Sequence, residues 1–303
     1  MPIVVDHRVP TFHLFLPQMR MTHVAIVERA LAAEAAGFEG IAFMDHLAPP
    51  MADHQPMWEA MELAGWVLAS TTTLRVGHLV LCDSWRHPAV LARQVVSHDH
   101  ASGGRFELGI GWGSVAEELH TFGIGSVEPR DRVRRLGESL QVMEALWSGE
   151  PIDFAGEHFT LVGAQQRPVP MAPVVTTIGG TGPRTLELVR RHADWWNLPV
   201  HQLDQLEELR AAAGDARVSA QVMVAVVPTE ADRDAVTASV RQRFGADGLG
   251  ALVVIGTTAE LAAHMAALAG RGVERIYVWF ADFAPPDSLA RFGEVIVASS
   301  APG

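Results

Sequence analysis

The sequence predicts an α/β protein whose strands and helices form a (β/α)8 TIM barrel. Short apolar segments alternate with segments of helical apolar spacing through the 303 residues, and eight strand–helix units can be counted. The predicted strands are apolar throughout, which is typical of a parallel sheet covered by helices. The first strand leads into Pro17-Gln18-Met19 and not into a dinucleotide-binding glycine fingerprint, so a doubly wound sheet is the weaker alternative.

The predicted elements follow one another in regular order. Strands are predicted at residues 11–16, 40–44, 74–81, 105–109, 174–177, 194–198, 218–227 and 275–280, with a further apolar run at 249–255. Helices are predicted at residues 23–36, 57–70, 88–102, 129–147, 184–192, 204–213, 230–244 and 258–268. Glycines such as Gly37 and prolines such as Pro88 mark the boundaries, because glycine favours helix ends and proline fits the first helical turn.

One connection is longer than the others. Between the fourth and fifth predicted strands, residues 111–171 contain a glycine-punctuated loop, the helix 129–147 and an extended hairpin at 151–162. Long connections in compact α/β domains are usually binding loops or lids. We therefore expect one domain over residues 1–303, with an inserted loop and hairpin region at about 111–171.

The stretch 173–186, PVVTTIGGTGPRTL, predicts a phosphate-binding turn. An apolar strand runs into three glycines, and Pro183 begins a helix for which Thr181 is the expected N-cap. Free N–H groups and the helix dipole both favour an anion at such a terminus. A plain βα turn has a similar composition and stays open as an alternative. The residues expected to contact the ligand are Ile178, Gly179, Gly180, Thr181, Gly182 and Arg184.

Composition argues against several classes of function. All 23 basic residues are arginine, so a lysine Schiff base and a phosphate-loop lysine are excluded. A net charge of −12 disfavours nucleic-acid and anionic-membrane partners. The single cysteine, Cys82, allows no internal disulfide and suits a cytoplasmic protein. The N-terminus is too polar for a signal peptide, no apolar run reaches the length of a membrane span, and the histidine spacing predicts no metal site.

Several segments together resemble the bacterial-luciferase-like family, the flavin- or deazaflavin-dependent oxidoreductases built on a TIM barrel. The segments occur in the family's order, cover nearly the whole chain, and are specific only in combination. They are AEAAGFEGIAFMDHL, TLRVGHLVL with RHPAVLARQV, SGGRFELGIG, the segment 118–123, WSGEPIDFAGEHF, IGGTG, HADWWN and GRGVERIYVWF. The resemblance implies that the middle hairpin closes over the substrate side of the cofactor.

The resemblance also implies a cofactor site at the carboxyl ends of the strands. It places the glycine turn at the cofactor phosphate, and residues 81–84 at a bulge behind the isoalloxazine ring. In many relatives this bulge carries a non-prolyl cis peptide, so a strained peptide, most often cis, is expected within 81–84. Further residues implied to bind the cofactor are Asp45, Leu81, Cys82, Asp83, Gly111 and Gly113.

His46 and Glu118 are the predicted catalytic residues. They match positions near the reactive face in deazaflavin-using relatives. A histidine pKa near neutrality suits proton transfer or the polarisation of an alcohol or carbonyl, and Glu118 would orient His46 or serve as the acid. The sequence departs from the family pattern at Trp112, where small residues are usual, and at Leu119, where a histidine is common.

The predicted function is hydride transfer between the deazaflavin coenzyme F420 and a small organic substrate. Two alternatives stay open: an FMN-dependent luciferase-like monooxygenase that uses oxygen, and a cofactor-binding barrel without turnover. A cytoplasmic homodimer is expected, because helix 57–70 is apolar over more than one stripe and a surface helix normally needs only one.

Overall fold

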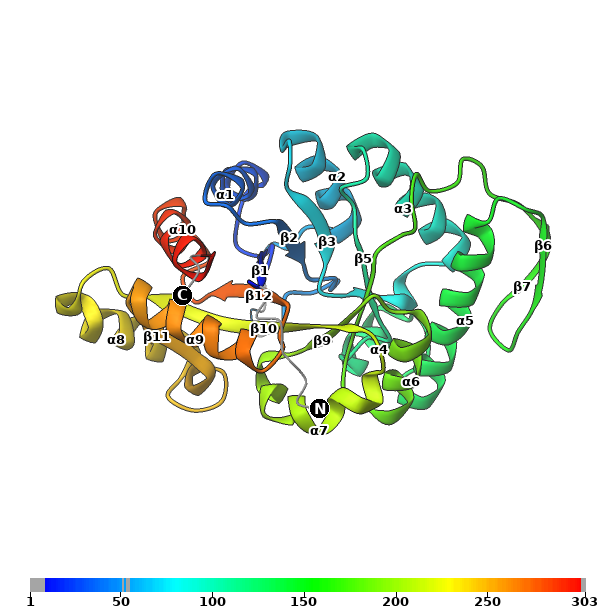
Figure 1. Ribbon diagram of the computed structural model, residues 1–303. Coiled ribbons are helices and arrows are strands. Elements are labelled where there is room, and N and C mark those ends of the chain that lie inside the picture. Colours follow the sequence, from blue (N-terminus) through cyan, green and yellow to red (C-terminus); the bar gives the residue numbers. More distant parts are fainter. Residues whose placement is uncertain (1–8, 51, 53–54, 301–303) are drawn as a thin grey trace, which may run out of the picture.

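The computed structural model describes residues 9–50, 52 and 55–300, and they form a barrel of parallel strands within a layer of helices (Figure 1). The predicted polar N-terminus therefore lies largely outside the described residues. The predicted (β/α)8 fold is confirmed, because neighbouring barrel strands all pair in parallel. The barrel strands are β1 (Thr11–Phe15), β2 (Gly40–Phe43), β3 (Arg75–His78) with β4 (Leu81–Cys82), β5 (Leu108–Gly111), β8 (Thr176–Gly179), β9 (Trp195–Leu198), β10 (Arg217–Val226) and β12 (Arg275–Phe280).

The third barrel strand is divided into two pieces that face different neighbours. β3 pairs with β2, and β4 pairs with β5. A non-prolyl cis peptide joins Leu79 to Val80 between the two pieces. The cis bond was expected within 81–84, so its predicted position is wrong. The polar residues that suggested it follow the strand and form a short 3-10 helix, Asp83–Trp85, while Leu81–Cys82 keeps its strand pairing.

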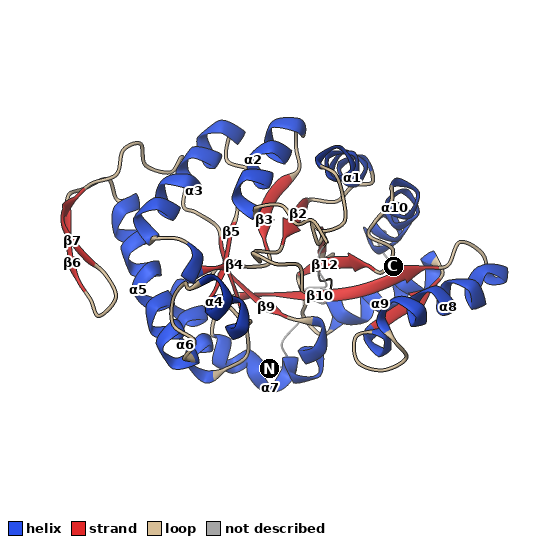
Figure 2. Ribbon diagram, turned by 180° about the vertical axis from the view of Figure 1, so that it is seen from behind, coloured by secondary structure: helices blue, strands red, loops and turns tan. Residues whose placement is uncertain are grey.

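The helices follow the predicted order, with two additions, α4 (Ala116–Phe122) and α10 (Pro286–Ser300) (Figure 2). The final helix, α10, was not predicted, although Leu289, Phe292 and Val295 repeat at helical spacing and are buried. Side-chain caps fix several boundaries, as where the Thr22 hydroxyl accepts a hydrogen bond from Ala25 N. The barrel helices are α1 (His23–Ala35), α2 (Ala60–Ser70), α3 (Pro88–Ser102), α5 (Pro129–Trp147), α6 (Pro183–His192), α7 (Leu206–Ala213), α9 (Thr258–Gly270) and α10 (Pro286–Ser300).

Two parts of the chain extend beyond the barrel at opposite ends of the view in Figure 1. On one side, the long strand β10 continues past β9 and pairs with β11 (Val253–Gly256), beside α8 (Arg233–Phe244). On the other side, the antiparallel hairpin of β6 (Ile152–Ala155) and β7 (Thr160–Ala164) lies outside α5. The hairpin is in the predicted place in the sequence, between the fourth and fifth barrel strands.

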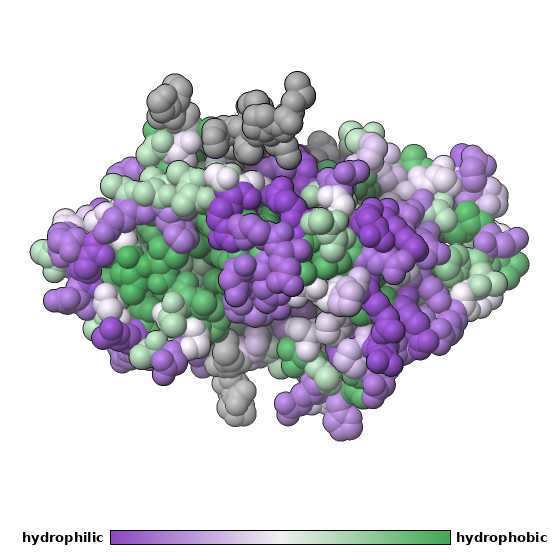
Figure 3. Space-filling view, turned by 60° about the horizontal axis from the view of Figure 1, so that its bottom comes forward, coloured by the Kyte–Doolittle hydropathy of each residue, from purple (hydrophilic) through white to green (hydrophobic). Residues whose placement is uncertain are grey.

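The outer surface mixes polar and apolar groups. On the face shown in Figure 3, hydrophilic residues (purple) alternate with apolar ones, and a broad apolar area (green) lies at the left of the view. Such a mixture is normal for a folded protein, because polar groups alone cannot cover its surface. None of the helices in the described part of the chain has the length and hydropathy needed to cross a bilayer.

A buried ion cluster fills the amino-terminal end of the barrel. The Glu107 carboxylate, just before β5, accepts hydrogen bonds from Arg275 Nη1 at 2.7 Å and from Arg75 Nε at 2.5 Å. Arg275 and Arg75 are the first residues of β12 and β3, so three strands meet at one carboxylate. Burial alone would raise the pKa of Glu107, but the guanidinium groups of Arg275 and Arg75 help to lower it to about 2.

We expect Glu107→Gln to destabilise the fold by about 3–5 kcal/mol, because it leaves buried arginine charge without its partner. The effect should depend on pH. A lowered carboxyl pKa stabilises the folded state above the ordinary pKa of about 4.5, and this stabilisation is lost as the pH falls toward 2. Urea unfolding between pH 7 and pH 3 measures both effects. Equal slopes of the unfolding free energy with pH in wild type and variant would contradict the assignment.

Candidate functional site

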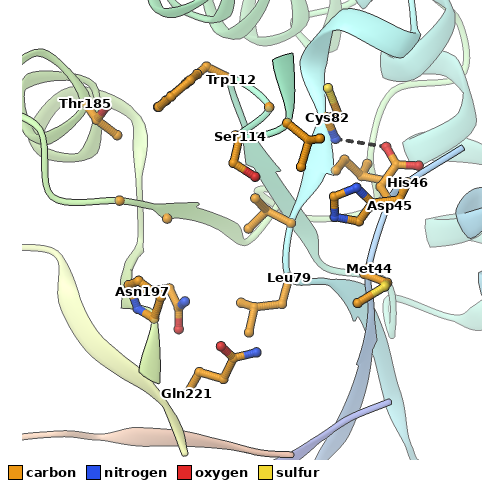
Figure 4. Close-up of a pocket in the computed structure, with 18 of the residues that line it drawn as sticks. Met44, Asp45, His46, Leu79, Cys82, Trp112, Ser114, Thr185, Asn197 and Gln221 are labelled. Atoms are coloured by element: carbon orange, nitrogen blue, oxygen red, sulfur yellow. Dashed lines mark hydrogen bonds between the residues drawn. The ribbon is translucent and has the colours of Figure 1, made fainter. Parts of the chain in front are cut away.

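The carboxyl ends of the barrel strands open onto a cavity of about 420 Å³. Residues from the loops after β2, β4, β5, β8 and β9 line it (Figure 4). Parallel strands end at the same rim of a barrel, so loops far apart in sequence converge there. The structure brings the following predicted site residues to this cavity: Asp45, His46, Leu81, Cys82, Gly111, Gly113, Glu118, Gly179, Gly180, Thr181 and Gly182.

Three predicted cofactor-binding residues do not line the cavity. Asp83 is buried in the short helix after β4, where its carboxylate pairs with Arg135. Burial raises the pKa of Asp83, although Arg135 opposes this shift. Ile178 points into the hydrophobic core, and Arg184 is exposed on the first turn of α6. Residue type and chain position alone could not show on which side of the backbone these side chains lie.

His46 and Glu118 form a hydrogen-bonded pair at the cavity wall. His46 Nδ1 lies 2.9 Å from Glu118 Oε2, and the other carboxylate oxygen accepts hydrogen bonds from Leu47 N and from Ala48 N at 2.9 Å. Burial alone would raise the pKa of Glu118, but the His46 ring and the two backbone N–H groups lower it below its ordinary value. Glu118 is therefore ionised at neutral pH and acts as an acceptor.

An ionised Glu118 decides which nitrogen of His46 is available for chemistry. A carboxylate can only accept, so His46 Nδ1 must donate, and the proton of the neutral imidazole is assigned to Nδ1. Nε2 then carries the lone pair and is the nitrogen left for a ligand in the cavity. This arrangement orients the ring and directs the basic nitrogen toward the cavity, as a general base requires.

Asp45 is fully engaged in holding two strand ends together. Its carboxylate accepts hydrogen bonds from Cys82 N at 2.8 Å and from Arg86 at 2.6 and 3.1 Å. Arg86 also pairs with Glu59. The contact links the end of β2 to β4 across the divided third strand and fixes the backbone next to His46 (Figure 4). Asp45 is therefore better described as a positioning residue than as a free carboxylate in the cavity.

The glycine turn presents an uncapped helix start to the cavity. The N-cap of α6 is Gly182 and not Thr181, so that prediction is wrong; the Thr181 hydroxyl instead bonds Gln202 at 3.1 Å. Gly180 has a φ of +122°, which side chains rarely adopt, and its carbonyl accepts a hydrogen bond from Trp196 Nε1 at 2.9 Å. Gly182 has no side chain to cap the first turn of α6, so the terminal N–H groups stay free for an anion.

The cavity is bordered by a different part of the inserted region from the one that was predicted. No residue of the hairpin β6–β7 lines the cavity, and the hairpin lies outside α5, so its expected closure over the substrate side is wrong. The short helix α4 (Ala116–Phe122) takes this place, with Val115 and Glu118 at the wall. The glycine-punctuated sequence around α4 obscured this helix, which has only seven residues.

Several wall residues were missed in the sequence. Gln221 had a signal, because it is a polar residue directly before the apolar run VMVAV in β10. Residues of irregular loops, such as His201, carry no comparable signal. The other residues of this group are Met44, Leu79, Val80, Thr185, Pro199 and Gln202. Trp85, Ser114 and Val115 lie in the loops after the third and fourth barrel strands, where the site was expected.

Away from the cavity, Asp131, Glu157 and His158 bring three possible metal ligands within 4.8 Å of one another. Arg134 already lies between the two acids, 3.1 Å from Asp131 Oδ1 and 3.2 Å from Glu157 Oε1. A guanidinium therefore supplies the positive charge at this cluster.

The chain is thus a parallel (β/α)8 barrel whose one rim carries an uncapped glycine turn and a histidine–carboxylate pair on the wall of one cavity. Residues 11–247 match the family model described as luciferase-like monooxygenase. The chain belongs to this family.

Two curated relatives are similar over part of their length. The chain is 33% identical over 170 residues to an F420-dependent glucose-6-phosphate dehydrogenase of Nakamurella multipartita, covering 56% of this chain and 50% of the relative. It is 31% identical over 199 residues to an F420-dependent hydroxymycolic acid dehydrogenase of Mycobacterium tuberculosis, covering 64% and 54%. The chain thus spans about half the length of the curated relatives it matches.

Solved structures show the same fold at lower identity. An F420-dependent secondary alcohol dehydrogenase in complex with an F420-acetone adduct superimposes with a TM-score of 0.82 at 19% identity, over 97% of this chain and 100% of the other. A long-chain alkane monooxygenase superimposes with a TM-score of 0.77 at 16% identity, over 96% and 90%. The barrel is therefore shared by proteins named for different chemistries.

We expect Glu118→Gln to change the tautomer of His46. The amide N–H2 of glutamine can donate to Nδ1, which would move the imidazole proton to Nε2 and remove the lone pair from the cavity side. The chemical shifts of ¹⁵N-labelled His46 report this directly, without any cofactor. An unchanged proton position in the variant would show that Glu118 does not control the ring.

Proposed function

We propose that this protein is an F420-dependent oxidoreductase that transfers a hydride between the deazaflavin coenzyme and a small organic alcohol or carbonyl compound. The observation that carries the proposal is the His46–Glu118 pair on the wall of a cavity that also contains the uncapped start of α6. The names of the curated relatives and of one similar fold support the choice of cofactor.

The residues of the cavity fit such a cofactor. Free N–H groups at the start of α6 suit a phosphate, and Thr185 adds a hydroxyl on the same side. Gly111 allows Val80 to pack closely against β5, because a Cβ there would meet Val80 Cγ2 at 2.7 Å. We assign the phosphate to the glycine turn and the ring to the surface formed by Val80, Leu81 and Gly111. When bound, F420 supplies the hydride chemistry, and the protein supplies binding and orientation.

His46 would handle the proton that accompanies hydride transfer. With Nδ1 held by Glu118, Nε2 can take the hydroxyl proton of an alcohol, or return it in the reverse direction. The negative charge of Glu118 stabilises the imidazolium that forms. His46 acts as the base and Glu118 as the orienting group, and neither role requires a metal ion.

The second candidate is an FMN-dependent monooxygenase that uses oxygen. The family description and the similar fold of the alkane monooxygenase favour it. A barrel that binds cofactor without turnover is the third possibility.

Titrating the purified protein with F420 and with FMN, followed by turnover assays with and without oxygen, distinguishes the three. We expect F420 binding and turnover that is unchanged when oxygen is removed. Tight FMN binding without F420 binding, or turnover that stops without oxygen, would contradict the proposal.

We expect Gly182→Val to weaken F420 binding at least tenfold while the fold is kept. Gly182 has an ordinary φ of −65°, and a Cβ there would lie 3.8 Å from its nearest neighbour, Thr185 Oγ1, so the larger side chain mainly fills ligand space. Gly180 is a poorer test position, because its φ of +122° makes any substitution strained. Fluorescence quenching measures the affinity.

A matched control for this experiment is Gly270→Val on α9, where a Cβ meets no atom within 4 Å. Equal F420 affinity in both variants would show that the glycine turn is not part of the cofactor site.

We expect His46→Ala to lower turnover by about 10²–10⁴-fold, because a positioned general base contributes that much. The F420 affinity should change far less, since the phosphate end of the site is untouched. His120→Ala, an exposed histidine on α4, is the control. A His46→Ala variant with nearly normal turnover would require another proton acceptor.

The homodimer stays a proposal. The apolar positions of α2 support it less strongly than the sequence suggested. Met61, Leu63, Ala64, Val67 and Leu68 of α2 are buried in the core of the chain itself, which leaves Trp66 59% exposed.

We expect a dimer at micromolar concentration that Trp66→Glu weakens and Val297→Glu, at an exposed position of α10, does not. Sedimentation velocity measures the state, and a wild-type monomer would refute the proposal.

A further inference from the structure

We infer that the cavity accepts an uncharged substrate, an alcohol or the corresponding ketone, and that Gln221 hydrogen-bonds its oxygen or a neighbouring polar group. The inference rests on the proposed function for its reaction, and deepens it by naming the substrate class and a specificity-determining residue. Two independent observations carry it: the charges of the cavity wall and an unpartnered amide on the cavity floor.

The cavity wall offers no fixed positive charge to an anionic substrate. Among its described residues, the acids are Asp45 and Glu118 and the histidines are His46 and His201, with no arginine. The whole chain contains no lysine, and residues 44–59 after β2 contain no arginine. A phosphate or carboxylate placed near His46 would lie close to the ionised Glu118 with no cation to offset the repulsion.

The arginines nearest to the wall are held by other groups. Arg86 is bound by Asp45 and Glu59. Arg132 is buried, donates to the carbonyls of Gly113 and Val127, and lies with its guanidinium 4.7 Å from the centre of the Trp112 ring.

Arg135 donates to the Asp83 carboxylate and to the Arg86 carbonyl at 3.1 Å. Moving any of these arginines into the cavity would break a buried hydrogen-bonded pair, which is costly. The exposed Arg184 belongs to the α6 side, where the cofactor phosphate is assigned.

Gln221 faces the cavity without a partner. It is 9% exposed, lines the cavity from the middle of β10, and makes no side-chain hydrogen bond within the described part of the chain. A buried amide normally has partners, so an unpartnered one facing a cavity marks a position for a ligand group. Figure 4 shows Gln221 near Asn197 and Leu79, away from Thr185 on the α6 side.

Neighbouring side chains agree with an uncharged ligand. Asn197 uses its carbonyl oxygen to accept a hydrogen bond from Ser219 Oγ at 3.1 Å, which directs its amide as a donor. The remaining wall near His46 is apolar, with Met44 and Leu79 as its main members. An amide donor and acceptor beside apolar groups suits a hydroxyl or ketone on a largely apolar body.

The first test compares uncharged alcohols with a phosphorylated sugar. With F420-loaded protein, we expect 2-propanol, cyclohexanol or glucose to support F420 reduction, and glucose 6-phosphate to have at least tenfold lower kcat/KM than the best uncharged alcohol. Calorimetry with glucose and glucose 6-phosphate gives the same comparison without turnover. Equal or tighter binding of the phosphorylated sugar would overturn the inference, as would failure of every uncharged alcohol to bind.

Val115→Arg tests the charge argument from the opposite direction. Val115 is 38% exposed at the wall, so a longer side chain can be accommodated. We expect Val115→Arg to improve binding of glucose 6-phosphate relative to glucose severalfold, in a manner that high salt removes, while Val115→Gln does not. If Val115→Arg and Val115→Gln bind glucose 6-phosphate equally well relative to glucose, the wild-type wall does not lack positive charge for the anion. That result would contradict the inference.

The second test separates substrate contact from cofactor contact. We expect Gln221→Leu to raise KM for the alcohol about three- to tenfold, the usual effect of one neutral hydrogen bond, while F420 affinity stays within twofold. Gln221→Asn should restore part of the loss. A change in F420 affinity with an unchanged KM would place Gln221 in the cofactor site and overturn its role. Failure of wild type to bind F420 would instead contradict the proposed function, and calorimetry on the protein alone would still test the substrate class.

Discussion

The closure of a parallel sheet is the constraint on which the rest of the structure depends. A barrel of parallel strands places every carboxyl end at one rim, so residues from five separate loops reach the same cavity. Closure is achieved where the third strand divides, with β3 bound to β2 and β4 bound to β5. Asp45 spans this division by accepting from Cys82 N and from Arg86. The same contact fixes the backbone that carries His46.

The two ends of the barrel differ in how their charged side chains are paired. At the amino-terminal end, Glu107 is matched by Arg275 and Arg75, and the cluster fills the space between three strands. At the carboxyl end, Arg86 and Arg135 are bound to Asp45 and Asp83, and the cavity wall keeps Glu118 with His46. The first arrangement closes the barrel. The second leaves a polar but cation-free cavity in which the orientation of one imidazole is controlled.

The site residues divide into groups with different tasks. The glycine turn and the start of α6 offer backbone donors, which recognise an anion without side-chain charge. His46 and Glu118 offer proton transfer, and Gln221 and Asn197 offer neutral hydrogen bonds on the cavity floor. Thr185 at the start of α6 and His46 lie on different sides of the cavity, so under the proposed function the anionic cofactor and the uncharged substrate would each have their own side (Figure 4).

The sequence by itself determined the fold class and most of the rim. Alternating apolar segments predicted the barrel strands, and the rule that sites lie after strand ends placed His46, Gly180 and Glu118 in one site, because these properties depend on local spacing. The tertiary structure alone decided which side of the backbone each side chain occupies. It turned Asp83 into a buried ion pair, moved the cis peptide to Leu79-Val80, and replaced the hairpin with α4 at the cavity wall. These outcomes depend on contacts between distant segments, such as Asp83 with Arg135, and a single sequence carries no record of such contacts.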